Sequence, residues 1–292
     1  MFQKISAQNK FLLDKPLSTD IVYASELNEW NTNNAFRSFC IKYVIDGCIS
    51  YSDSRFYFDV RSGHYLMACK KDYVKGELVS PHAARSFCID ICPETIAETY
   101  TILTTANEDF DSYLAGYFHC PEFMETLHQV QSTSIGNKLL TLLYKVNSGA
   151  DILLNKEWFI DLAERMIYQE YGNYMALKEI HSVKPSTRKE VLRRLQVAKE
   201  FIDHNYLQIR LVSEVADHCS MSEYHFYRRF KEVYKRTPYQ YLTEIKMQAA
   251  KSLLLEKKYT ITDVASLSGF QDVFTFSKAF KKFYGIPPSQ VR

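Results

Sequence analysis

Apolar residues in the last third of the chain recur at helical spacing, and the arrangement occurs twice. One run lies in residues 222–234 and the other in residues 272–284. In each run the apolar positions fall at i, i+4 and i+7, which places them in one stripe along a helix. We therefore expect two amphipathic helices whose stripes face inward. The stripe residues are Phe226, Phe230, Val233, Phe276, Phe280 and Phe283.

A shorter helical pattern and a tight turn precede each of these runs. In the first copy, Cys219-Ser220-Met221 is the expected turn and Ser222 the expected N-cap of the next helix. In the second copy, Gly269 can take the positive φ that ends a helix, and Asp272 is the expected N-cap. Each copy thus predicts a helix, a turn and a second helix. The apolar positions of the two short helices are Leu211, Val212, Val215, Ala216, Ile261, Val264, Ala265 and Leu267.

The two copies form an internal repeat, because their second helices match at an offset of 50 and the upstream Glu214-Val215-Ala216 matches Asp263-Val264-Ala265 at an offset of 49. A period of this size indicates one supersecondary unit used twice. Between the copies, the pattern predicts a helix from Pro238 to Leu255, which would be about 27 Å long at 1.5 Å per residue. A helical turn of DNA is about 34 Å, so such a rod can set two helices into successive major grooves. The matching residues are Phe226, Phe230-Lys231, Tyr234, Pro238 and Gln240, against Phe276, Phe280-Lys281, Tyr284, Pro288 and Gln290.

Charge divides the chain in the same place as the repeat. Residues 188–292 carry 19 lysines and arginines against 11 aspartates and glutamates, a net charge of +8. Residues 1–187 carry a net charge of −6, so the total of +2 hides a basic block joined to an acidic one. A basic block of this kind is typical of a module that binds a polyanion. Amphipathic periodicity alone would fit an ordinary helical domain, but the repeat, the short turns and the charge together favour DNA binding.

The residues of this block resemble the DNA-binding domain of AraC/XylS-type transcription regulators, over roughly residues 190–292. The resemblance implies seven helices with two helix-turn-helix units on a connecting helix, and it implies that the second helix of each unit enters the major groove. The second copy carries it through Gly269-Phe270, Asp272, Phe276-Ser277-Lys278-Ala279-Phe280-Lys281-Lys282 and Gly285-Ile286-Pro287-Pro288-Ser289. The first copy carries it through Ser222, His225-Phe226, Arg228-Arg229-Phe230-Lys231 and Thr237-Pro238-Tyr239-Gln240-Tyr241-Leu242.

The same resemblance assigns roles to the outward residues of the two recognition helices. Arg228 can donate two hydrogen bonds to a guanine edge, whereas lysines near the helix ends neutralise phosphates. Val273 and Phe274 depart from the polar residues often found there, and they either contact thymine methyl groups or pack inside the protein. The implied base readers are Tyr224, Tyr227, Arg228, Val273, Phe274, Thr275 and Lys278, after the cap residue Ser222. The implied phosphate contacts are Lys231, Lys281 and Lys282.

The first 187 residues predict short strands followed by helices. Turn signals such as Asp46-Gly47 separate the strands, and many short strands with frequent turns indicate a small barrel or jelly roll. From about residue 108 to 182 the pattern is helical, with apolar clusters within 139–143 and 158–167. Lys184-Pro185-Ser186 has the composition of a linker, and Thr187 with Glu190 forms a capping box that we expect to start the next helix. The expected strands are 39–45, 48–51, 56–60, 64–69, 73–79 and 87–92.

This half of the chain shows no catalytic, metal or cofactor motif. The seven cysteines include no Cys-x-x-Cys pair, so we expect reduced structural thiols. Cys92-Pro93 and Cys120-Pro121 reverse the order of the Pro-Cys-His-Arg centre found in alkyl-transfer repair enzymes that share this type of DNA-binding domain. Tyr43, Tyr51, Tyr57 and Tyr65 either line an effector pocket or belong to the barrel core. Histidines at 64, 82, 119 and 128 include no His-x-His pair typical of metal-dependent cupins.

Together these patterns predict an α+β protein with an N-terminal cupin-like β-barrel, following helices and a C-terminal all-α domain with two helix-turn-helix units. We expect a sensor and dimerisation domain at 1–182 (barrel about 10–100, helices about 108–182), a linker at 183–189 and a DNA-binding domain at 190–292. The expected function is sequence-specific binding of double-stranded DNA by a cytoplasmic, homodimeric regulator, an activator that contacts RNA polymerase and responds to a small-molecule effector. The barrel with helices resembles the sensor half of the same family, in which helices such as 136–180 dimerise. The alternatives are an effector-binding or enzymatic N-terminal domain and a nonspecific DNA anchor.

Overall fold

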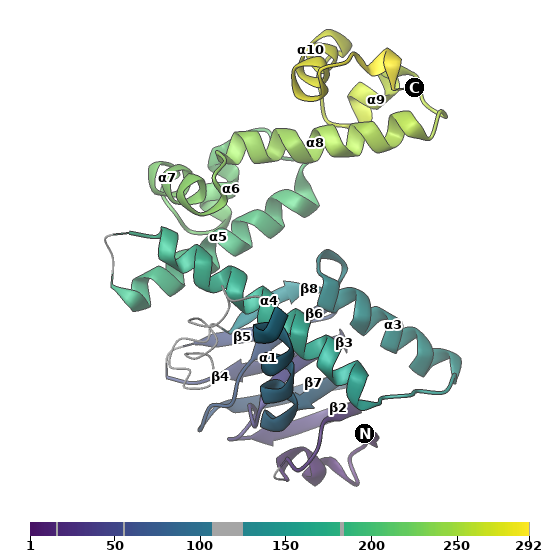
Figure 1. Ribbon diagram of the computed structural model, residues 1–292, viewed down its shortest axis with the longest axis vertical. Coiled ribbons are helices and arrows are strands. Elements are labelled where there is room, and N and C mark those ends of the chain that lie inside the picture. The colour runs from purple at the N-terminus through teal and green to yellow at the C-terminus, as the bar shows by residue number, and fades with distance from the viewer. Residues whose placement is uncertain (16, 55, 107–124, 182–183, 292) are drawn as a thin grey trace. The chain divides into compact units, whose positions relative to one another are not determined.

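The structure is a computed structural model that describes residues 1–15, 17–54, 56–106, 125–181 and 184–291. The chain forms two compact units, an N-terminal unit of Met1–Asn173 and a C-terminal unit of Tyr174–Arg292. Strands occur in the N-terminal unit and helices make up the C-terminal unit in the part that is described (Figure 1). The predicted α+β class is therefore confirmed.

The N-terminal unit is built around one curled sheet. The described strands are ordered β1-β2-β7-β3-β6-β8, and β4 pairs with both β5 and β7. Strand β7 bends the sheet, because its first residues pair with β4 whereas its last residues pair with β3. The sheet thereby wraps around an apolar cluster that includes Phe36, Val60 and Leu66, as expected for a cupin-like barrel, with β1 and β8 at its edges. The strands are β1 (Phe2–Ile5), β2 (Ile21–Thr32), β3 (Phe39–Asp46), β4 (Cys48–Ser52), β5 (Tyr57–Arg61), β6 (His64–Ala68), β7 (Lys75–Ile91) and β8 (Thr126–Gln129).

Strand β7 corrects the expectation of two strands at 73–79 and 87–92. Its register against β2 shifts between Leu27 and Glu29, where Leu27 pairs with Ala84 and Glu29 pairs with Val79. Residues 80–83 bulge out opposite this shift, so the missing N–H of Pro81 costs no ladder hydrogen bond. The turn signal is therefore real, but it marks a bulge inside one strand rather than a break between two.

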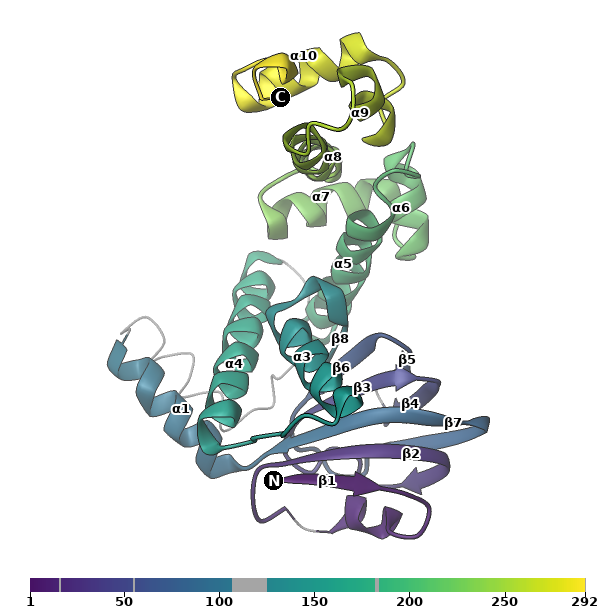
Figure 2. The ribbon, with the colours of Figure 1, turned by 90° about the vertical axis from the view of Figure 1, so that its right-hand side faces the viewer.

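Helices of the N-terminal unit cover one face of the sheet (Figure 2). The hydroxyl of Tyr65 lies 2.8 Å from that of Thr133, and Gln169 lies 2.6 Å from the ring of His128, so β6 and β8 are tied to the helical layer. Burial lowers the pKa of His128 to about 4, which keeps the ring neutral at physiological pH. The sequence pattern did not predict α1. Residues 107–124, with Cys120 and His119, lie outside the described residues. The helices are α1 (Pro93–Ala106), α3 (Ser134–Ser148) and α4 (Lys156–Glu179, which continues into the C-terminal unit), with 3-10 turns at Lys10–Asp14 and Val130–Ser132.

The C-terminal unit repeats one three-helix arrangement at the two ends of α8. One apolar cluster gathers around Phe226 and Phe230, and the other around Phe276 and Phe280, all four fully buried. The helix predicted from Pro238 to Leu255 is confirmed as α8, whose start is fixed by a capping box of Thr237. The helices are α5 (Pro185–Asn205), α6 (Val212–His218), α7 (Glu223–Tyr234), α8 (Pro238–Leu255), α9 (Ile261–Leu267) and α10 (Val273–Tyr284), with a 3-10 turn at Pro288–Gln290.

Two details differ from expectation. Helix α5 begins at Pro185 with Lys184 as N-cap rather than at a Thr187 cap, because proline at the first helical position already has the helical φ. Phe283 is 45% exposed rather than inward, and Tyr284 packs on the second cluster in its place.

Candidate nucleic-acid interface

Helix α7 presents a polar and aromatic face to solvent because its opposite face is anchored by Phe226 and Phe230. Tyr224 is 71% exposed and Tyr227 is 45% exposed, and the side chain of Arg228 is 53% exposed. Lys231 is also exposed. The residues that the sequence assigned to DNA in this helix therefore lie on one accessible face.

The turn before α7 depends on backbone geometry rather than on a side-chain cap. Ser222 occupies the N-cap position as predicted, but its side chain makes no capping hydrogen bond. Ser220 instead adopts a left-handed φ of 55°, and Arg194 of α5 donates a hydrogen bond of 2.7 Å to its carbonyl. Sequence reasoning missed Arg194, since it lies 26 residues before the turn that it supports.

Arg228 is held in place by the acidic residue one turn later. Its Nε donates a 3.0 Å hydrogen bond to Glu232, and this bond raises the pKa of Arg228. Arg229 donates to the other oxygen of Glu232 at 2.6 Å and to the carbonyl of His181 at 3.2 Å, and it is buried. The bond from Nε orients the guanidinium, and the terminal nitrogens of an arginine can donate two hydrogen bonds to a guanine edge. Arg229 and Glu232 were also missed, although their i,i+3 and i,i+4 spacing is a recognisable signal.

Helix α10 is the equivalent of α7, and its N-terminus is fixed by Asp272. Asp272 accepts a 2.7 Å hydrogen bond from the backbone N–H of Thr275 and another of 2.7 Å from its hydroxyl. The backbone bond is the main cause of the lowered pKa of Asp272. Thr275 is exposed as predicted, but its hydroxyl is engaged by the cap, which leaves its methyl group as the part available to a base.

The two apolar residues at the start of α10 separate into the two roles that the sequence left open. Phe274 is 84% exposed, whereas Val273 is partly buried and packs against the second cluster. An exposed aromatic ring on such a helix can contact a thymine methyl group. Val273 packs α10 against the apolar cluster beneath it. Lys278, Lys281 and Lys282 are exposed on the same helix. Each unit thus combines a rigid apolar base with aromatic and cationic side chains that face solvent.

No cluster of three or more metal-ligating side chains occurs in the described ranges, and no described helix is long and apolar enough to cross a membrane.

Comparison with known proteins agrees with this geometry. A family model described as a helix-turn-helix domain matches residues 215–292. The raffinose operon transcriptional regulatory protein RafR of Pediococcus pentosaceus is 28% identical over 166 residues, which cover 57% of each chain. The lactose operon transcription activator of Staphylococcus xylosus is 35% identical over 98 residues, which cover 34% of this chain and 35% of that protein. Among solved structures, the C-terminal domain of AraT, a response regulator from Geobacillus stearothermophilus, is 29% identical with a TM-score of 0.33, over 34% of this chain and 83% of its own.

The matches thus span from about a third to just over half the length of these curated relatives. The residues that the family model matches, 215–292, lie in the part of the chain that forms two helix-turn-helix units on α8. Residues 215–292 of this chain are therefore similar to a helix-turn-helix domain, and the curated relatives that match the chain include operon regulators.

Proposed function

We propose that this protein is a transcription regulator that recognises a specific sequence of double-stranded DNA by placing α7 and α10 in successive major grooves. The observation that carries the proposal is the pair of equivalent exposed faces, each held by two buried phenylalanines at opposite ends of one helix, α8. The net charge of +8 in residues 188–292 supplies the phosphate attraction that such binding needs.

The N-terminal unit has the sensing and assembly role in this proposal, with the functional division of the chain at residues 183–189. We place homodimerisation on the helices within 136–180, and a monodisperse monomer by light scattering at micromolar concentration would contradict this. The relatives named as operon regulators and as a transcription activator support a role in gene regulation. In this proposal the protein is a cytoplasmic activator that contacts RNA polymerase, and it is not an enzyme.

Selection of binding sites from random duplex DNA by the full-length protein, at two salt concentrations, tests the proposal. The expected result is a motif with two informative blocks about one helical turn apart. Arg228→Ala should relax one guanine in one block, whereas Arg61→Ala, an exposed arginine of the N-terminal unit, should leave the motif unchanged. If no motif emerges and affinity falls equally for all sequences as salt rises, the C-terminal unit is a nonspecific anchor and the proposal fails.

A further inference from the structure

A small cavity lies inside the curled sheet of the N-terminal unit. Its volume is about 30 Å³, counted as the space that the centre of a water molecule can occupy. One water needs about 10–15 Å³ of such room, so the cavity holds about two or three groups of that size. Most of its walls are buried apolar side chains, with a few polar groups at defined places. The lining residues that matter for ligand binding are Ser25, Leu27, Trp30, Lys42, Ile49 and Leu78.

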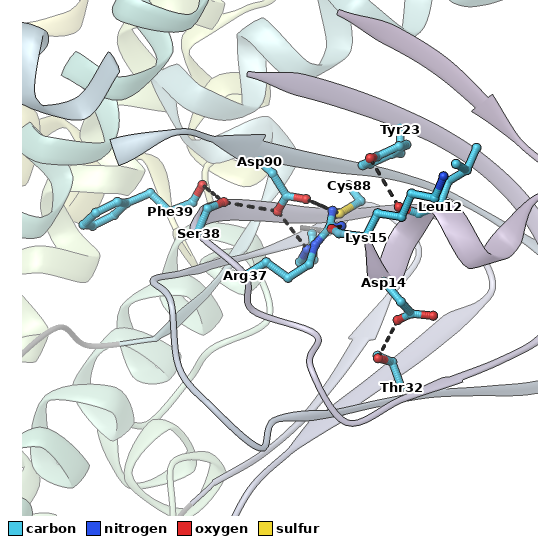
Figure 3. Close-up of polar contacts among 11 residues, drawn as sticks. Leu12, Asp14, Lys15, Tyr23, Thr32, Arg37, Ser38, Phe39, Cys88 and Asp90 are labelled. Atoms are coloured by element: carbon cyan, nitrogen blue, oxygen red, sulfur yellow. Dashed lines mark hydrogen bonds and ion pairs between the residues drawn. The ribbon is translucent and has the colours of Figure 1, made fainter. Parts of the chain in front are cut away.

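One wall of this cavity belongs to a buried cluster of charges. Asp90 is fully buried and forms ion pairs with Arg37 and with Lys42, whose side chains are 5% and 3% exposed. Figure 3 shows Asp90 bonded to Arg37 and to the hydroxyl of Ser38. Two cations thus face one carboxylate, which leaves a net charge of +1 in a cluster whose side chains are at most 5% exposed. Buried charge without compensation is costly, and proteins normally pair it.

Lys42 is the member of the cluster that reaches the cavity. Its Nζ lies 3.3 Å from Asp90 and 2.8 Å from the sulfur of Cys88. Burial disfavours the charged form, but the attraction of Asp90 outweighs it and holds the pKa of Lys42 above its ordinary value. An ammonium group has three donors, and a thiol is a weak acceptor, so the hydrogen-bonding capacity of this cation is poorly matched by the protein.

Further polar groups of the cavity add donors rather than charge. The hydroxyls of Ser25 and Ser86 lie 2.6 Å apart across β2 and β7. The indole N–H of Trp30, which is 9% exposed, has no hydrogen-bond partner among the described residues. A buried donor left without an acceptor is destabilising, so an acceptor placed in the cavity beside Trp30 would be stabilising.

We infer that this cavity binds a short-chain monocarboxylate of two or three carbons, whose carboxylate pairs with Lys42 and whose alkyl group contacts Leu27, Ile49 and Leu78. A single negative charge balances the net +1 of the cluster, and a methyl or ethyl group joined to a carboxylate corresponds to the two or three water-sized groups that the cavity can hold. The inference deepens the sensing role proposed for the N-terminal unit and rests on it. The serine hydroxyls and the Trp30 N–H supply the remaining donors to the ligand.

Calorimetric titration of the full-length protein with sodium acetate and with propionate, at pH 7 and constant chloride, tests the inference. Acetamide is the neutral probe of nearly the same shape. The expected result is saturable binding of a carboxylate, at least tenfold tighter than acetamide. Lys42→Met should weaken it at least tenfold, whereas Lys75→Met, which removes an exposed lysine of β7, should leave it unchanged.

A second variant separates loss of the site from loss of the fold. Ser25→Leu fills the cavity and leaves Lys42, Asp90 and Arg37 in place, so it should also abolish binding. Three results would overturn the inference. They are equal binding of acetamide and acetate, retained binding in Lys42→Met, and no saturable signal at ligand concentrations up to about 50 mM. These measurements need no DNA, and the site selection described above needs no ligand, so either can fail without the other.

Discussion

Replacing Asp90 with asparagine removes the only carboxylate that the structure places between Arg37 and Lys42, at nearly unchanged volume. The buried cluster then carries a net charge of +2 instead of +1. The Lys42–Asp90 pair at 3.3 Å corresponds to a Coulomb energy of about 5 kcal/mol at an effective dielectric constant of 20. Removing one partner of a buried ion pair typically costs about 3–5 kcal/mol. We therefore expect Asp90→Asn to lower the free energy of unfolding of the N-terminal unit by about 3–5 kcal/mol.

Urea denaturation followed by tryptophan fluorescence measures this loss directly. Both tryptophans of the chain, Trp30 and Trp158, lie in the N-terminal unit, so the signal reports on that unit. Asp72→Asn is the matched control, because Asp72 is exposed, and it should change stability by less than about 0.5 kcal/mol. A cost below about 1 kcal/mol for Asp90→Asn would show that the cluster does not depend on this carboxylate.

The opposite substitution gives a sharper check of the same reasoning. Lys42→Met leaves Arg37 and Asp90 as a neutral pair, so its cost should be well below that of Asp90→Asn. If Lys42→Met is the more damaging change, the argument from net charge is wrong.

Acid should erase the difference between the wild type and Asp90→Asn. Burial raises the pKa of Asp90, but Lys42 and Arg37 lower it by more, and the folded value lies below the ordinary one. A carboxylate with a lowered pKa stabilises the fold fully above its unfolded pKa of about 3.9, and this contribution is lost as pH falls through the folded value. The two stability curves should therefore converge below about pH 4 and run parallel above it.

Three further predictions concern the C-terminal unit. Glu232→Gln removes the carboxylate that orients Arg228 and that repels DNA phosphates. Fluorescence anisotropy should therefore show DNA binding that is a few-fold tighter but discriminates less at the guanine read by Arg228. Unchanged discrimination would contradict the orienting role of Glu232. Phe274→Ala should weaken DNA binding about tenfold at an unchanged melting temperature, whereas Val273→Ala should lower the stability by about 1 kcal/mol. If Val273→Ala weakens DNA binding and Phe274→Ala lowers the stability, Val273 contacts DNA and Phe274 packs in the protein. Thr237→Ala removes the cap of α8 and should cost about 1 kcal/mol in thermal unfolding followed by circular dichroism; no loss would show that Pro238 alone starts the helix.

The C-terminal unit was predictable because its information is local. The stripe of Phe226 and Phe230, the cap Asp272 and the span of α8 each depend on residues within a few turns of one another, and all are found where the sequence places them. Residue exposure was less predictable. Val273 and Phe274 are adjacent and both apolar, and only the packing of α9 and α8 beneath α10 decides which one is covered.

The N-terminal unit was predictable only in part, because its structure depends on distant pairing. Strand β2 is not evident in the sequence because polar residues such as Glu26 and Asn28 interrupt its apolar pattern, and its partner β7 begins more than 40 residues after β2 ends. The pair of Lys42 and Asp90 is separated by 48 residues, and no rule of sequence places a lysine in a core. The cavity that these strands enclose was therefore invisible in the sequence, although Tyr51, one of the four tyrosines considered for it, does line it.

Helix α8 also fixes the rotational phase of the two recognition helices. Its 18 residues make about five complete turns, so its two ends present nearly the same azimuth to the units that pack on them. Inserting one residue would rotate α10 by about 100° relative to α7 and aim it away from the groove. Inserting seven would restore the phase of α8 to within about 20° but lengthen it by about 10 Å, which is about three base pairs. The DNA groove rotates by about 100° over three base pairs, so this insertion should also weaken binding to the two-block site. The length of α8 therefore sets both the distance between the two recognition helices and their relative rotation. The spacing of the DNA site can change only where both remain matched to the DNA helix.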